Sequence, residues 1–203
     1  MNWLIKNAFV VNQGAVKKTD VLIRNGLIEQ VGDDLKAPED IPVLDAGGKY
    51  LLPGVIDAQV HFREPGLTHK ATIYTESKAA VAGGITSYME MPNTIPNTLT
   101  QELLEEKYGI AAKNSLANYS FFMGVNGANW DEAIKTNPRN VCGITDDGLY
   151  FSGTGNLLCS NPAAMEQIFS ESKMLVTIHS EDESMIEKNL ETFKLKYGED
   201  IPV

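Results

Sequence analysis

The distribution of apolar and polar positions along the chain changes near residue 53. Before this point, short apolar stretches alternate with polar residues and are separated by turn signals such as Asn25-Gly26 and Gly47-Gly48. Asn-Gly readily adopts the positive φ angles of a tight hairpin turn. Residues 1–52 are therefore expected to form a small flanking β-sandwich segment, and nothing in it indicates chemistry.

Residues 53–203 alternate apolar stretches with segments of helical composition, a pattern typical of a parallel sheet covered by helices. Strands are expected at 55–62, 85–91, 118–125, 141–145 and 174–181. No Gly-x-Gly-x-x-Gly follows the first strand, and polar residues gather at several strand C-termini, as they do in barrel enzymes. We therefore favour an α/β (β/α)8 TIM barrel over an open doubly wound sheet. Since a complete barrel takes ~250 residues, about five of its eight βα units are expected here.

Two of the expected strands end in residues that could bind a metal ion. Gln59, His61 and Arg63 follow one another at intervals of two, so they are expected on one face of the first strand, and His179 ends the fifth strand. Imidazole ligates zinc, an amide oxygen can do so weakly, and a guanidinium binds a carboxylate bidentately. Since barrel strands converge at their C-terminal ends, the two histidines predict a shared metal site. The alternative is a pair of hydrogen-bonded structural histidines and an ordinary surface turn at Arg63.

Two further strands are followed by polar residues that could serve a site but are also common in turns. The fourth strand leads into Asp146-Asp147-Gly148, and the second into Pro92-Asn93. Carboxylate and amide groups at these positions could serve a metal or a substrate. Because Asp, Asn and Gly are common in turns, both stretches can equally be read as plain turns.

Composition restricts the classes of partner. The chain of 203 residues has a formal net charge of −10, which argues against nucleic acid and anionic membrane surfaces because both would repel it. No apolar run reaches the length of a spanning helix, and the first residues lack a signal-peptide layout, so a cytoplasmic protein is expected. Two cysteines, Cys142 and Cys159, give neither a disulfide framework nor a zinc-finger spacing.

Four motifs carry a resemblance to a known family. The string from Pro53 to Gly66 resembles the first-strand motif of the amidohydrolase superfamily, and its Arg-Glu-Pro-Gly end resembles dihydroorotases in particular. Met91-Pro92-Asn93-Thr94 resembles the dihydroorotase second-strand motif, and the stretch from Val176 to Asp182 resembles the fifth. Thr145-Asp146-Asp147-Gly148 resembles the fourth-strand string from which some dihydroorotases take an aspartate ligand. The chain departs from the family at Gln59, where the usual pattern has the first histidine of His-x-His.

The resemblance implies a hydrolase that reversibly opens dihydroorotate to N-carbamoyl-aspartate in pyrimidine biosynthesis, with one or two zinc ions as cofactor. It implies that Arg63 and Asn93 contact the substrate carboxylate. The implied metal ligands are His61, His179, Gln59 and an aspartate of the fourth strand, since no lysine lies between Lys135 and Lys173; we choose Asp147, and Asp146 stays open.

The family takes a further histidine ligand from its sixth strand and a general acid/base aspartate from its eighth, strands that the chain is not expected to contain. Three interpretations follow. The chain is part of an active dihydroorotase, or it is a non-catalytic homologue that binds partners, or it is another cyclic amidohydrolase such as a dihydropyrimidinase or allantoinase. Arg-Glu-Pro-Gly and Met-Pro-Asn-Thr favour dihydroorotase over the third, and homo-oligomerisation stays open.

Overall fold

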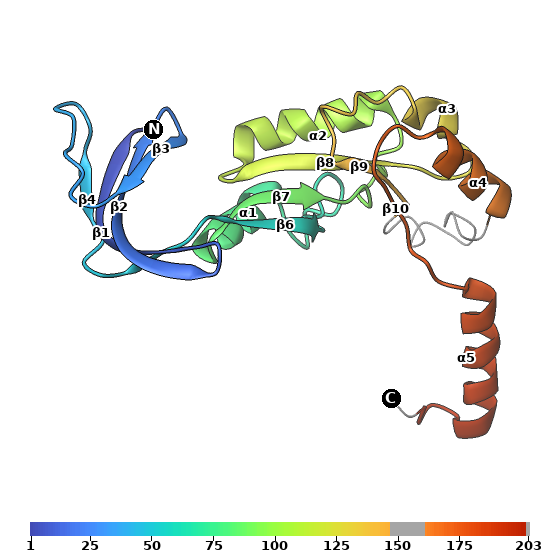
Figure 1. The fold of residues 1–203 in the computed structure, drawn as a ribbon. Coiled ribbons are helices and arrows are strands. Elements are labelled where there is room, and N and C mark those ends of the chain that lie inside the picture. The colour runs from blue at the N-terminus through green and yellow to red at the C-terminus, as the bar shows by residue number, and fades with distance from the viewer. Residues whose placement is uncertain (147–160, 202–203) are drawn as a thin grey trace. The chain divides into compact units, whose positions relative to one another are not determined.

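The chain folds as two compact units, Met1–Gly54 and Val55–Val203. The computed structural model describes residues 1–146 and 161–201 (Figure 1). In this part of the chain, no helix combines the length and the apolar character needed to cross a membrane.

The first unit is a β sheet built around one long strand. Its strands are β1 (Trp3–Asn12), β2 (Ala15–Arg24), β3 (Leu27–Gly32), β4 (Val43–Asp45) and β5 (Tyr50–Leu51). The hydrogen-bonded order is β3-β2-β1-β4, and β5 also pairs with β1. Asn25 and Gly26 have φ angles of 53° and 78° between β2 and β3, as the predicted hairpin turn requires. Leu4, Leu22 and Ile41 form a small separate core.

The second unit has a sheet of five parallel strands in the order β10-β9-β8-β7-β6. The strands are β6 (Val55–Val60), β7 (Ile85–Glu90), β8 (Asn118–Gly124), β9 (Gly143–Thr145) and β10 (Val176–Thr177). The helices are α1 (Ile73–Ala82), α2 (Gln101–Asn114), α3 (Trp130–Ala133), α4 (Pro162–Glu171) and α5 (Glu183–Tyr197). Each strand pairs with its neighbour in the chain, so all five C-terminal ends lie at one edge of the sheet.

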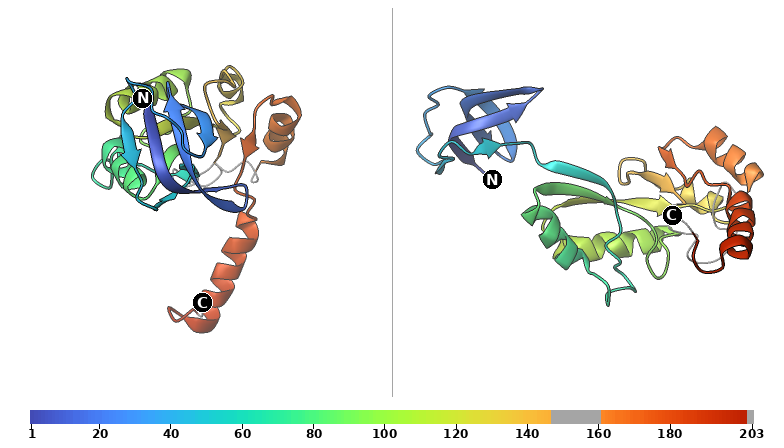
Figure 2. Two further views of the ribbon diagram at one scale, coloured as in Figure 1. Left: turned by 60° about the vertical axis from the view of Figure 1, so that its left-hand side comes forward. Right: turned by 90° about the horizontal axis from the view of Figure 1, so that it is seen from below.

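The core of this unit lies between the sheet and its helices. Helix α1 packs on β7 and α2 on β8 (Figures 1 and 2). Thr72 and Thr100 cap the two helices by accepting the backbone N–H groups of Thr75 and Leu103. The buried apolar residues include Ile73 of α1, a set of aromatic side chains and residues of the central strands: Phe62, Tyr88, Leu104, Phe121, Met123 and Ile144.

All five strands of this sheet are shorter than the sequence predicts, and the differences at β6 and β10 concern predicted site residues. β6 ends at Val60 rather than at residue 62, and Arg63 has a φ of 68°, outside the extended region. The prediction that Gln59, His61 and Arg63 share one strand face was therefore wrong, because the alternation holds only within an extended strand. β10 comprises only Val176–Thr177, so His179 lies beyond the ladder.

Tyr88 allows a test of this core. The hydroxyl of Tyr88 donates to Ser115 Oγ at 3.1 Å, and burial raises its pKa from 10.0 to about 12. Since the unfolded chain ionises Tyr88 first, the stabilising contribution is complete below pH 10 and is lost as the pH rises towards 12, by up to about 2.7 kcal/mol. Tyr88→Phe should therefore cost stability at pH 8, and the deficit should shrink above pH 10 in urea unfolding curves. Tyr74→Phe, at an exposed tyrosine, should show no such trend; a deficit of Tyr88→Phe that is constant with pH would contradict the assignment.

Candidate active site

The predicted site residues lie where β6, β7 and β10 end. On β6, the carboxylate of Asp57 accepts the backbone N–H of Gln59 at 3.2 Å, which helps to fix the backbone near the end of the strand. His61 and Arg63 follow directly after the end of β6 at Val60. The local cause is the Pro-Gly pair at residues 65 and 66, which forbids further extension of the strand.

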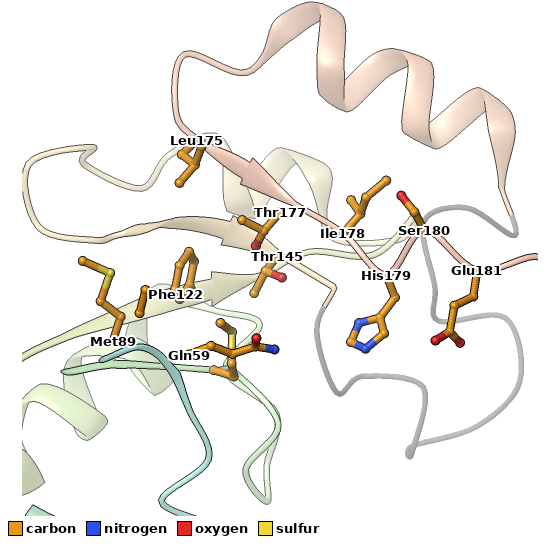
Figure 3. Close-up of a pocket in the computed structure, with 12 residues that line it drawn as sticks. Gln59, Met89, Phe122, Thr145, Leu175, Thr177, Ile178, His179, Ser180 and Glu181 are labelled. Carbon is orange, nitrogen blue, oxygen red and sulfur yellow. The ribbon is translucent and has the colours of Figure 1, made fainter. Parts of the chain in front are cut away.

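Gln59 and His179 border the same cavity, of about 600 Å³. Figure 3 shows the amide of Gln59 and the imidazole of His179 entering this space from the β6 side and the β10 side. Thr145 and Thr177 also line it, and the hydroxyl of Thr177 is buried and has no hydrogen-bond partner within the described residues. Within the described residues, Gln59 and His179 line this cavity, whereas His61 and Arg63 do not.

His61 is joined to Asn93 across the tips of β6 and β7. Its Nδ1 lies 2.8 Å from Asn93 Oδ1. An amide oxygen can only accept, so in this contact Nδ1 carries a proton and donates it. A metal-ligating histidine usually makes such a contact with its second nitrogen. The structure thus brings together one predicted ligand and one predicted substrate contact.

Asn93 lies in a loop that is fixed by its own hydrogen bonds. Thr94 Oγ1 donates to Pro96 O at 2.9 Å, and Thr98 donates its backbone N–H to Pro92 O at 2.9 Å. Asn93 is 7% exposed, and within the described part of the chain its Nδ2 has no hydrogen-bond partner. A buried amide donor without an acceptor is costly, by about 1–3 kcal/mol, and it is a natural position for an anionic ligand.

The Arg-Glu-Pro-Gly segment is anchored on both sides. Glu64 Oε2 accepts the backbone N–H of Ile73, the first residue of α1, at 2.7 Å. Pro65 O accepts the N–H of Ile95 at 3.2 Å. Gly66, at φ 83°, lies so close to the second loop that a Cβ atom would come within 2.0 Å of Ile95 O. The segment that carries Arg63 is therefore clamped to the segment that carries Asn93.

The two aspartates of the fourth strand are described unequally. Asp146 is fully buried, and its Oδ1 accepts the backbone N–H of His179 at 2.9 Å. This contact aligns the end of β10 with β9. Asp147, our choice for a metal ligand, lies outside the described residues.

The donor chemistry suits a metal ion, although the described residues do not complete a site. Imidazole nitrogens, a carboxylate and an amide oxygen are all zinc ligands. However, residues 1–146 and 161–201 contain no group of three His, Cys, Asp or Glu side chains placed to hold one ion.

A buried ion pair that sequence reasoning missed lies directly behind these loops. Lys107 Nζ on α2 is 2.8 Å from Glu90 Oε2 at the end of β7, and both side chains are 1% exposed. The signal was present in the sequence: Glu90 interrupts an apolar strand, and Lys107 falls on the buried face of α2, between Leu104 and Ala111.

Residues 48–198 match the family model described as "Dihydro-orotase-like". The chain belongs to the dihydroorotase-like family. It is 38% identical over 186 residues to a curated dihydroorotase of Methanosarcina acetivorans, covering 89% of this chain and 39% of that protein. It is 36% identical over 194 residues to a dihydroorotase of Lactococcus lactis, covering 92% and 44%. The dihydroorotase-like chain thus spans about two fifths of the length of these relatives.

Solved structures of hydantoinases share the fold. An L-hydantoinase (dihydropyrimidinase) from Arthrobacter aurescens superposes with a TM-score of 0.82 over 98% of this chain and 45% of its own, at 24% identity. A D-hydantoinase (dihydropyrimidinase) from Thermus sp. gives a TM-score of 0.66 over 97% and 43%, at 28% identity. The likeness includes both units of the chain.

The clamp between the two loops can be tested with matched glycine variants. Gly66→Ala should lower the free energy of unfolding by roughly 3 kcal/mol or more, because both the positive φ and the contact with Ile95 oppose a side chain. Gly84 has a φ of 91° with nothing near its would-be Cβ. Gly84→Ala should therefore cost only ~1–2 kcal/mol. Equal losses in urea unfolding would show that the loops can separate freely.

Proposed function

We propose that this chain contributes to the active site of a metal-dependent dihydroorotase, which interconverts dihydroorotate and N-carbamoyl-aspartate. Its five parallel strands are the first five of a (β/α)8 barrel, with residues 1–52 as the flanking β-sandwich segment and residues 53–203 as the barrel portion. Family membership and the curated dihydroorotases at 36–38% identity support this reading.

The observation that carries the proposal is the buried Nδ2 group of Asn93, which has no hydrogen-bond partner among residues 1–146 and 161–201. It lies in a fixed loop that is bonded to His61 and clamped to the segment of Arg63. Both the ring and the opened form of the proposed substrate carry a carboxylate. Asn93 and Arg63 would donate to that carboxylate, and charge-assisted bonds of this kind are about twice as strong as neutral ones.

Gln59, His61, Asp147 and His179 would hold one or two zinc ions, with Asp146 as the alternative carboxylate. When bound, zinc supplies a polarised substrate carbonyl and a water of pKa ~7. The residues of this chain orient the reactants. The Asn93 contact fixes the Nδ1-protonated tautomer of His61, and Asp146 fixes the backbone at His179.

A dihydropyrimidinase is the second candidate, because solved structures that share this fold include hydantoinases and dihydropyrimidinases. The ring of dihydrouracil lacks the carboxylate of dihydroorotate. An arginine and a buried amide donor at the substrate position would then have no charge to bind.

A chimera tests the function directly. In it, this chain replaces the matching N-terminal portion of the Methanosarcina acetivorans dihydroorotase, and cyclisation of N-carbamoyl-aspartate is measured. We expect activity, and we expect Arg63→Met and Asn93→Ala each to lower kcat/KM by roughly 10- to 100-fold, mainly through KM. Arg139→Met, at an exposed arginine, should have no effect.

The other outcomes of this assay are equally decisive. A folded but inactive chimera would support a non-catalytic homologue. A chimera that hydrolyses dihydrouracil faster than it cyclises carbamoyl aspartate would support the dihydropyrimidinase reading.

Metal retention tests the ligand set on this chain itself. Gln59→His should raise the zinc retained after dialysis, because imidazole is a better ligand than an amide oxygen. His179→Ala should lower it, whereas His69→Ala should leave it unchanged. Zinc content is measured by elemental analysis; if it fails to respond to Gln59→His and to His179→Ala, these two residues are not ligands.

A further inference from the structure

The ion pair between Glu90 and Lys107 has no place in the chemistry described so far. Both residues are at most 1% exposed, and Lys107 Nζ also lies 4.9 Å from the centre of the Phe121 ring. Burial raises the pKa of the Glu90 carboxyl and lowers that of the Lys107 ammonium, because each charge has lost its water. Apolar residues of similar size often replace such pairs with little loss of stability. A role in geometry therefore needs to be considered.

The second contact of each partner leads to one of the site loops. Glu90 Oε1 accepts the backbone N–H of Phe62, which directly follows His61, at 3.2 Å. Lys107 Nζ donates to the backbone O of Met91, two residues before Asn93, at 3.0 Å. The pair thus holds the backbone beside His61 and the backbone leading to Asn93 at the same time.

These contacts continue the pairing of β6 with β7. Val60 aligns with Glu90 in the parallel register, and Met91 donates its N–H to Val60 O at 3.0 Å. Beyond this point the ladder between the two strands ends, because both chains turn away into loops. Past this point the ion pair connects the two segments, because the side chains of Glu90 and Lys107 bond to the backbone of Phe62 and Met91.

We propose that Glu90 and Lys107 are positioning residues that set the His61–Asn93 contact. By fixing the two backbones, the pair holds His61 Nδ1 against Asn93 Oδ1, selects the Nδ1-protonated tautomer of His61 and aims the Nδ2 group of Asn93. The importance of this contact for ligand binding rests on the proposed function. The geometric claim itself needs neither metal nor substrate.

The test compares two double variants of the chain by long-range 1H–15N spectra of its imidazoles at pH 7.5. The protein has three histidines, and His61→Phe assigns the signal of His61. In the wild type we expect the Nδ1-protonated pattern. In Glu90→Gln/Lys107→Met, which removes both charges at nearly constant volume, the population of this tautomer should fall at least twofold while the thermal midpoint stays within ~5 °C.

An exposed ion pair provides the matched control. Glu132 and Lys135 also lie 2.8 Å apart, with the lysine side chain 63% exposed. Glu132→Gln/Lys135→Met should leave the His61 spectrum unchanged. An unchanged spectrum in the folded Glu90→Gln/Lys107→Met variant would overturn the proposal, as would an Nε2-protonated His61 in the wild type.

Two further points keep the test decisive. If the double variant at Glu90 and Lys107 does not fold, Glu90→Asp takes its place, because it retains the charge but withdraws the carboxylate from Phe62. The same twofold loss of tautomer is expected, and its absence would again overturn the proposal. An inactive chimera together with a His61 tautomer that depends on the pair would refute the proposed function and leave the positioning role standing.

Discussion

The parallel pairing of β6 with β7 is the constraint on which the candidate site depends. Because Val60 lies opposite Glu90, the residues that follow each strand emerge side by side at the same edge of the sheet. A shift of this register would separate His61 from Asn93 and would move Phe62 away from the carboxylate of Glu90. The contacts of the Glu90–Lys107 pair and of the loops begin where this ladder ends, and they extend the alignment that the backbone pairing starts.

The acidity of the protein gives these local contacts an electrostatic context. A chain with a formal net charge of −10 repels small anions as a whole. Binding a carboxylate therefore requires donors whose positions are fixed before the ligand arrives. If Arg63 and Asn93 bind the carboxylate as proposed, the clamp on the segment of Arg63 and the hydrogen bonds of the Asn93 loop would reduce the loop ordering that opposes binding.

Much of the fold could be predicted from the sequence because its strands are apolar and end abruptly in polar residues. The hairpin at Asn25-Gly26 and the alternation of strands and helices follow from local chemistry alone. The residue at which β6 ends was not predicted. Pro65-Gly66 marks where the strand must stop, but the segment that carries Arg63 is also held by hydrogen bonds of Glu64 and Pro65 to the backbone of Ile73 and Ile95. For the candidate site, the sequence suggested which side chains to consider, but it did not indicate which of them form hydrogen bonds with one another.

The partners of these side chains explain the difference. His61 with Asn93, and Asp146 with the backbone of His179, are contacts between residues about thirty positions apart, and no local pattern encodes them. Glu90 and Lys107 were overlooked for a related reason. A charged residue within an apolar stripe is informative only when its partner is known, and the partner lies on another element.

The short strand β10 has a consequence for how the site can change. Its ladder with β9 ends at Thr177, and the next hydrogen bond is made by a side chain, from the amide of His179 to Asp146. The backbone at His179, a predicted metal ligand, is thus held by the side chain of Asp146 and not by the backbone ladder of the sheet. A substitution of Asp146 alone could therefore change the position of His179 without changing the pairing of β9 with β10.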